Sequence, residues 1–135
     1  MMWKALAAAT GASGVLLAAF GAHGLERITD AKGLRWWAIG VALQLVTAPV
    51  LLTSSALPRS RARDAAGALL AVGLVLFSGS LYAMTLGAPR FWGAITPLGG
   101  LSLCAGWVLT AFAKRPDAAE AAPRREHAAP KSLGR

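Results

Sequence analysis

The feature that most constrains this chain is a set of four long stretches that contain no Asp, Glu, Lys or Arg. They cover residues 5–24, 36–57, 65–86 and 92–113. A membrane-spanning helix needs about 20 predominantly apolar residues, because it rises about 1.5 Å per residue and the hydrocarbon layer is about 30 Å thick. Each of the four stretches is therefore long enough to cross a membrane.

Helix is the secondary structure that these stretches are expected to adopt in lipid. Backbone groups left unpaired in hydrocarbon are costly, and four strands are too few to close a barrel. The composition agrees, because 56% of the residues are hydrophobic and only 15% are charged, which is more apolar than a soluble core requires. The sequence predicts an all-α integral membrane protein, a bundle of four transmembrane helices.

The composition changes after the last apolar stretch. Residues 114–135 consist mainly of Ala, Pro and charged residues, with no apolar periodicity. Such a segment cannot bury enough apolar surface to offset the entropy lost on folding. We expect a transmembrane domain over residues 1–113 and a disordered basic tail over residues 114–135.

The basic residues are distributed unequally between the two sides of the predicted domain. The amino terminus, the second loop and the tail carry one, three and six Lys or Arg, ten of the 14 in the chain, whereas the first and third loops carry the other four. Because basic loops stay in the cytoplasm, both termini are predicted to be cytoplasmic. The net charge of +8 would suggest nucleic acid for a soluble protein, but here it is assigned to topology and to a solvated tail. Attraction of the tail to anionic lipid at the membrane surface is the alternative.

Small residues recur at helical spacing and predict close helix packing. In the first stretch the spacings alternate between four and three residues, in the third every spacing is four, and in the fourth the spacings are three, four and four. Small side chains let two helix backbones approach in a membrane. The positions selected for packing are Gly11, Gly14, Gly79, Ala83, Gly99 and Gly106, with Gly87 next in the series of the third stretch.

Lys4 followed by the first apolar stretch resembles a signal peptide, but the stretch is long for a signal core, so we expect it to be retained.

Two prolines within the stretches predict local disturbance of the helices. Pro97 should make the last helix bend or start late, and Pro49 should kink the second helix. The carbonyl freed by Pro49 needs a donor in lipid, for which the hydroxyls of Thr47 and Thr53 are candidates.

The uncharged polar side chains of the stretches gather in their outer half. Counted from the outer helix ends, the depths are about 6 Å for Thr96, about 9 and 12 Å for Ser80 and Ser78, and about 12 and 16 Å for Gln44 and Thr47. His23 lies above them, near several tryptophans. This candidate polar layer has two interpretations: hydrogen bonds between helices, or an outward-facing pocket for a lipid headgroup or a small neutral ligand. We prefer the first, since polar side chains within spans need partners whether or not a ligand exists.

No group of residues suggests catalysis. The spans hold no Asp, Glu, Lys or Arg that could serve as a proton or ion relay, Cys104 is the only cysteine, and no metal or nucleotide motif occurs. His23 has no reactive partner in the sequence. We therefore expect no enzymatic activity, no catalytic residue, no metal and no cofactor.

Several short motifs resemble a known family. They are AFGAHGL at 19–25, Trp37 with Gln44, LFSGSLY at 76–82, and ITPLGG at 95–100 followed by GW. Over residues 11–112 the chain resembles domain of unknown function 423, a family of small bacterial membrane proteins related to eukaryotic transmembrane protein 256. The resemblance implies a four-helix protein of the inner (plasma) membrane without a named activity. Thr47 stands where members often carry histidine, which weakens any mechanism based on a histidine pair.

These observations favour a structural, accessory or complex-assembly role. The alternatives are a channel or carrier for a small neutral solute, and a lipid-binding protein with an outward-facing polar pocket. The expected partners are the lipid bilayer and either a second copy of the chain or another membrane protein; nucleic acid is not expected.

Overall fold

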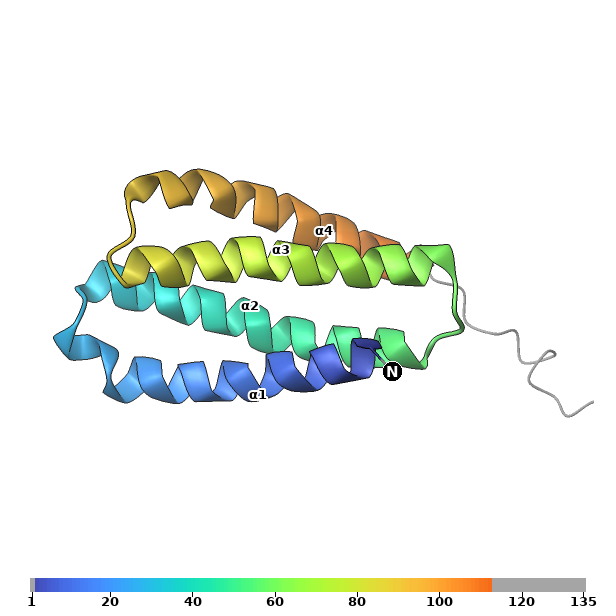
Figure 1. Cartoon of the computed structure of the whole chain (residues 1–135), viewed down its shortest axis with the longest axis horizontal. Helices are drawn as coiled ribbons and strands as arrows, with labels where there is room; N and C mark the ends of the chain where they lie inside the picture. Colours follow the sequence, from blue (N-terminus) through green and yellow to red (C-terminus); the bar gives the residue numbers. More distant parts are fainter. Residues whose placement is uncertain (1, 113–135) are drawn as a thin grey trace, which may run out of the picture.

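The computed structural model describes residues 2–112 and is almost entirely helical (Figure 1). The long helices are α1 (Met2–His23), α2 (Ala31–Ala56), α3 (Arg61–Thr85) and α4 (Ile95–Phe112). Two short 3₁₀ helices, η1 (Leu25–Arg27) and η2 (Arg90–Ala94), lie in the α1–α2 and α3–α4 connections. Four segments are long and apolar enough to span a membrane, the last being α4 together with η2. The predicted all-α membrane class is confirmed, and the predicted disordered tail lies outside the described residues.

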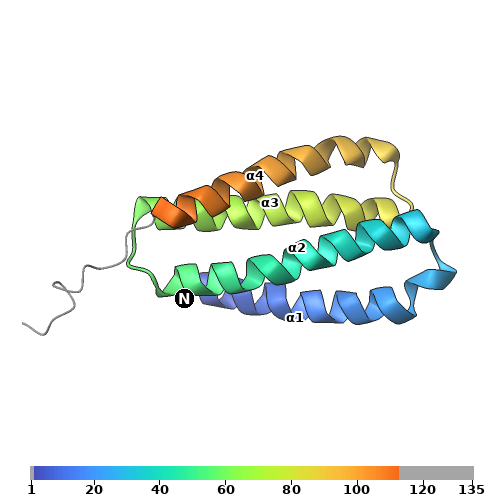
Figure 2. The same ribbon diagram turned by 180° about the vertical axis from the view of Figure 1, so that it is seen from behind.

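The four helices form an open row rather than a closed ring. The main helix contacts join neighbours in the sequence, α1 with α2, α2 with α3, and α3 with α4, and α1 and α4 form the two edges (Figures 1 and 2). The start of α1, the α2–α3 connection and the end of α4 share one end of the row, here called the terminal end. The other end carries η1 and η2 and is called the η end.

Hydrogen-bonded caps make α2 and α3 longer than the spans predicted from the sequence. Asp30 Oδ1 accepts a bond from the Gly33 amide at 2.8 Å, and Ser60 Oγ accepts one from the Arg63 amide at 3.1 Å. Such caps satisfy amides that have no partner within the helix. The helices therefore begin before the apolar stretches at 36–57 and 65–86, and their first turns carry charged residues.

Gly87 ends α3, which corrects its predicted role in helix packing. Its φ of +97° lies in the left-handed region, which glycine adopts without steric cost. The Ala88 amide donates to the Ala83 carbonyl at 2.9 Å and the Gly87 amide donates to the Met84 carbonyl at 3.2 Å. This is the Schellman arrangement that closes many helix ends.

The two prolines behave differently. η2 precedes α4, and Pro97 falls in the first turn of α4, where a missing amide is tolerated; the late start predicted for this helix is observed. Pro49 lies inside α2. The Thr47 hydroxyl donates to the Leu43 carbonyl at 2.7 Å and the Thr53 hydroxyl to the Val50 carbonyl at 3.1 Å, so the expectation that either one compensates for Pro49 is wrong.

Glycines bring the backbones of α3 and α4 into direct contact. A Cβ atom placed on Gly99 would lie 2.9 Å from the Gly73 carbonyl oxygen and would also collide with the Phe77 amide nitrogen. One on Gly106 would lie 2.8 Å from the Leu70 Cγ. Only residues without a side chain fit at these positions, as expected where membrane helices approach closely.

The small residues of α1 pack against α2. A Cβ atom on Gly14 would lie 2.7 Å from Leu45 Cδ2, and one on Gly11 would lie 3.6 Å from Ala48 Cβ. The first helix is therefore held by side chains fitting over glycines, whereas α3 and α4 meet backbone to backbone.

Gly79 does not pack against another helix, and its assignment to a packing face is a second correction. A Cβ atom at this position would meet nothing within 4 Å. The glycine of α3 that meets α4 is Gly73, which is rotated to a different face of the same helix. Ala83 is half-buried, and its carbonyl contributes to the cap at the end of α3.

Two apolar clusters fill the row. The larger one, toward the terminal end, joins all four helices and consists of Ala7, Leu51, Leu70, Leu74 and Leu103. The smaller one, at the η end, consists of Leu25, Trp37 and Val41. Leu25 is fully buried, so η1 packs its side chain between α1 and α2.

A polar cluster ties the terminal end together. Arg63 donates to the Leu57 carbonyl at 3.0 Å and to Asp64 Oδ1 at 2.8 Å, and the Trp3 indole donates to the same Oδ1 at 3.1 Å. The Arg63–Asp64 pair is the only salt bridge among residues 2–112. The start of α1 is thereby connected to the start of α3.

The contact between α3 and α4 predicts opposite outcomes for two glycine substitutions. Gly99→Ala should lower the free energy of unfolding by about 1–3 kcal/mol, because its methyl group has no space against the α3 backbone. Gly79→Ala should leave it unchanged or raise it by up to about 1 kcal/mol, because alanine is the better helix former and meets nothing. Unfolding of both variants in mixed detergent, followed by circular dichroism, measures the difference. Equal losses would place Gly79 in a helix contact.

Candidate functional site

Gln44 is the centre of a hydrogen-bond network that joins three helices. It lies midway along α2 and is only 7% exposed. Its Nε2 donates to the Thr10 carbonyl at 3.0 Å and to Ser13 Oγ at 2.7 Å, both on α1. The Tyr82 hydroxyl of α3 donates to Gln44 Oε1 at 2.9 Å. These four residues are called the Gln44 network, and they use both amide donors and the carbonyl of the glutamine.

Trp37 supports the network from the η end. Its indole donates to the Leu17 carbonyl at 2.8 Å, and its ring packs on Tyr82 with the centroids 4.6 Å apart. Two glycines make room for these rings: a Cβ atom on Gly21 would lie 2.6 Å from Trp37, and one on Gly40 would lie 2.7 Å from Tyr82. The aromatic side chains that orient the Tyr82 hydroxyl are thus fixed on both sides.

Two hydroxyls of α3 bond to backbone carbonyls of α2. Ser78 donates to Gly40 at 2.8 Å, and Thr85 shares its proton between the Gly33 carbonyl at 3.1 Å and the Leu81 carbonyl of its own helix at 2.8 Å. Both hydroxyl-bearing residues are buried. They pin α3 to α2 at two levels beside the Gln44 network.

A separate pair of hydroxyls joins α3 to α4. Ser80 and Thr96 have their oxygens 2.7 Å apart, and Ser80 also bonds to the Phe77 carbonyl at 2.8 Å. With Ser80 donating to that carbonyl, Thr96 is the donor within the pair. The pair is therefore satisfied without a ligand.

The predicted polar layer is divided between these two places. Gln44 and Ser78 lie between α2 and its neighbours, whereas Ser80 and Thr96 lie between α3 and α4. Thr47 is fully buried but bonds only within its own helix. His23 is exposed at the end of α1, and within residues 2–112 its side chain has no hydrogen-bond partner. It does not join the other residues of the layer.

Sequence reasoning missed three members of the Gln44 network. Tyr82 follows Ser78 by four residues and therefore shares its helix face, which was the available signal. Thr10 and Ser13 are three residues apart on α1, and Thr10 contributes only its carbonyl. No sequence pattern marks which backbone carbonyl a distant glutamine will reach.

A cavity of about 420 Å³ lies between α1 and α3 over the Gln44 network. Its polar lining atoms belong largely to the network and already bond one another, and Gly79 leaves its wall open. The lining residues are Ala9, Thr10, Ser13, Gln44, Leu74, Val75, Ser78, Gly79 and Tyr82.

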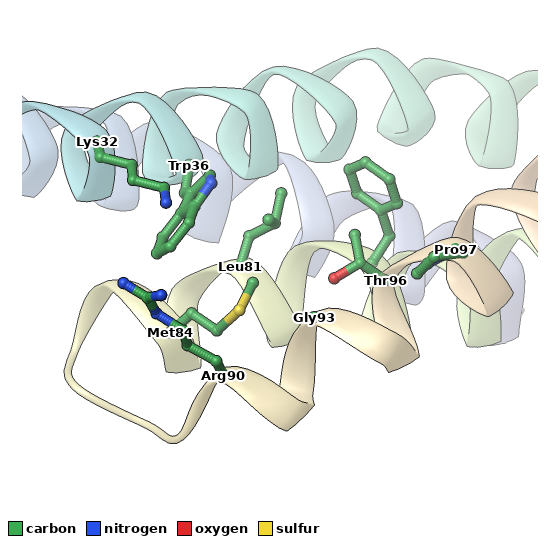
Figure 3. A pocket seen from close by; sticks show the side chains of 9 residues that line it. Lys32, Trp36, Leu81, Met84, Arg90, Gly93, Thr96 and Pro97 are labelled. Carbon is green, nitrogen blue, oxygen red and sulfur yellow. The ribbon is translucent and has the colours of Figure 1, made fainter.

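A second groove, of about 510 Å³, runs between α2 and α4 at the η end, and Figure 3 shows its side chains. It is lined by Lys32, Trp36, Phe77, Leu81, Met84, Arg90, Gly93, Thr96 and Pro97. The Lys32 ammonium lies 5.0 Å from the centre of the Trp36 ring, a cation–π distance. This volume is called the α2–α4 groove.

Groups that could hold a metal ion do not assemble in the described part of the chain. No three His, Cys, Asp or Glu side chains of residues 2–112 come together in that way. Cys104 is exposed on α4.

Comparison with known proteins identifies relatives among bacterial membrane proteins. The family model described as "Protein of unknown function (DUF423)" matches residues 17–100. The UPF0382 inner membrane protein YgdD of Escherichia coli K12 is 38% identical over 106 residues, covering 76% of this chain and 81% of its own length. A UPF0382 membrane protein of Haemophilus influenzae is 37% identical over 109 residues, covering 79% and 88%. YwdK of Bacillus subtilis is 39% identical over 101 residues, covering 72% and 82%. No solved structure matches the chain significantly.

The Gln44 network predicts a coupling between two side chains 38 positions apart. Gln44→Leu should destabilise the protein by about 1 kcal/mol, since membrane hydrogen bonds are worth that order of energy. Tyr82→Phe should cost a similar amount, and the double variant should cost less than the sum, because each substitution removes the same bond. Detergent unfolding of the three variants measures this. Thr53→Val, which removes a bond within one helix, is the control, and additive losses for Gln44 and Tyr82 would contradict the network.

Proposed function

The chain belongs to the DUF423 family of membrane proteins, and from this premise we propose that it serves in the inner membrane as a non-enzymatic accessory or complex-assembly protein. Relatives with the same family name include an inner membrane protein, and the four spanning helices suit that location. The proposed partners are another membrane protein or a second copy of the chain.

The completeness of the Gln44 network is the observation that carries this proposal. Both donors and the carbonyl of the glutamine amide are bonded within the protein. Buried donors and acceptors normally find partners within the protein. An amide that binds a ligand would therefore leave at least one donor or acceptor free to face that ligand. Gln44 is better suited to holding α1, α2 and α3 together than to recognising a solute.

The distribution of apolar side chains favours this role over a channel or carrier. Between the Gln44 network and the terminal end, the interior is filled by the larger apolar cluster, with Leu51, Leu70 and Leu103 almost completely buried. A polar solute that crossed this apolar region would lose its hydrogen bonds to water without gaining others, which costs free energy. The packing therefore supports an accessory or assembly role more than solute transport.

The edge helices supply surfaces for assembly. α1 and α4 each pack mainly against one neighbouring helix, and Leu16 and Leu101 are 71% and 69% exposed. In a membrane these faces meet lipid or another helix. An open row leaves two such faces available, which a closed four-helix ring would not.

The proposed orientation places both termini in the cytoplasm. An even number of spans puts the start of α1 and the end of α4 on the same side, and the terminal end also carries the α2–α3 connection. The amino terminus, the α2–α3 connection and the segment that follows α4 in the sequence carry ten of the 14 Lys and Arg. The bias of basic residues toward the cytoplasm supports the assignment.

Photo-crosslinking in native membranes tests the assembly role. A photoreactive residue at Leu101 or Leu16 should give an adduct with a protein, detected as a shifted band and identified by mass spectrometry. The same residue at Leu103, which is only 3% exposed, should crosslink within the chain and serve as the control. Adducts with lipid alone at both exposed positions would contradict a protein partner.

Reporter fusions test the orientation. A fusion after Leu57 should be active as a cytoplasmic reporter, and one near Asp30 should be active as an external reporter. The segments predicted to be cytoplasmic carry ten Lys and Arg, whereas the two loops predicted to be external carry four. An external signal at Leu57 would reverse the topology.

A further inference from the structure

The α2–α4 groove exists because both of its walls pack on α3 and have no extensive contact with each other. Its floor is apolar and consists of Phe77, Leu81 and Met84. Its volume of about 510 Å³ falls within the range of about 300–1,000 Å³ common for small-molecule sites. The groove is thus large enough to hold part of a ligand rather than only a water molecule.

Two cations stand at the mouth of the groove. Lys32 extends from α2 and Arg90 from η2, and Figure 3 shows their charged groups ending on the same side, beside Trp36. A further cavity of about 400 Å³ at the η end is also lined by Lys32, Trp36, Met84 and Arg90. The groove therefore changes from an apolar interior to a cationic mouth without interruption.

No described carboxylate forms a salt bridge with either of these cations. The only salt bridge of residues 2–112 is at the terminal end. Asp30 also lines the mouth, but its Oδ1 caps α2 by accepting from Gly33, and it forms no salt bridge with Lys32 or Arg90. The mouth thus carries two cations and one carboxylate, and an anion placed between the two cations would offset their mutual repulsion.

The Thr96 hydroxyl within the groove needs no polar ligand as a hydrogen-bond partner. Thr96 lines the groove, but it is paired with Ser80, which bonds onward to the Phe77 carbonyl. The interior thus offers hydrocarbon contacts, and the polar selectivity is confined to the mouth. This division matches the structure of a phospholipid.

The depth of the groove also fits one leaflet. Phe77 lies eight residues before Thr85, the last residue of α3, which corresponds to about 12 Å along the helix at about 1.5 Å per residue. One leaflet contributes about half of the 30 Å hydrocarbon layer, or about 15 Å. An acyl chain entering beside Trp36 would follow the groove over most of its leaflet.

We infer that the α2–α4 groove binds an anionic phospholipid. The phosphate lies between the Lys32 ammonium and the Arg90 guanidinium, and one acyl chain lies over Leu81 and Phe77. The proposed orientation assigns the lipid to the outer leaflet, but the site itself depends on neither that orientation nor a protein partner.

Purified full-length protein in mild detergent, titrated with dioleoyl phosphatidylglycerol, tests the inference. The lipid should raise the melting temperature and should remain bound in native mass spectrometry, because a ligand of the folded state stabilises it. The Lys32→Gln/Arg90→Gln variant should bind at least about tenfold more weakly, since it loses two charge-assisted contacts. Unchanged affinity in this variant would overturn the inference.

Charge-matched controls separate a site from a general attraction. Arg27→Gln/Arg35→Gln removes the same number of charges from the η end, but neither residue lines the groove, so the affinity should remain near that of the wild type. An equal loss in both double variants would mean a nonspecific surface effect. Glycerol 3-phosphate at the same concentration should not stabilise the protein; stabilisation equal to that by the lipid would mean a free-anion site and contradict the proposal.

Filling the groove tests the position of the acyl chain. A Cβ atom on Gly93 would lie 3.5 Å from Met84 Sδ, so Gly93→Leu should occupy the groove, leave both cations in place and weaken phosphatidylglycerol binding. Gly79→Leu extends into the other cavity and should leave binding unchanged. If Gly93→Leu alters only the monomer–dimer balance and not lipid binding, the groove holds a second copy and the lipid assignment is wrong.

Discussion

The backbone contact between α3 and α4 at Gly73 and Gly99 determines much of the remaining architecture. Because neither position carries a side chain, the two helices approach closely there. Toward the η end the facing positions of α3 are large, including Phe77 and Met84, which line the space beside α4. Close approach at the glycines and bulk beyond them give a groove that is closed at its deep end and open at its mouth.

Hydrogen bonding in the absence of water explains the rest of the interior. A polar side chain in hydrocarbon retains its partners only if the protein provides them. Gln44 takes its partners from two neighbouring helices, Ser78 and Thr85 use carbonyls of α2, and Ser80 pairs with Thr96. Ser54 is the buried side chain of residues 2–112 whose hydroxyl has no partner. Apart from Ser54 and from Thr47, which bonds only within α2, these buried polar side chains lie where helices are joined.

Sequence patterns predicted the helices well because charge and its absence mark the membrane boundaries directly. They predicted Gly99 and Gly106 as packing positions, and the structure places both against α3. They failed for Gly79, since spacing identifies a helix face but not the neighbour that it meets, and the face bearing Gly73 is the one that contacts α4. Lys32 and Arg90 are far apart in the chain, and nothing in their local sequence predicts that both lie at the mouth of the α2–α4 groove. Tyr82 was missed although it follows Ser78 by four residues and so shares its helix face.

The sequential contacts of the row also suit the order in which a ribosome delivers the helices. The first pair, α1 and α2, already satisfies both amide protons of Gln44 through Thr10 and Ser13, so a newly inserted hairpin need not expose them to lipid while synthesis continues. Only the glutamine carbonyl waits for Tyr82 of the third helix. The final helix then docks on α3 through glycines, without disturbing the earlier bonds. Assembly can therefore proceed one helix at a time as the chain emerges, because each new helix packs against the helix that precedes it in the sequence.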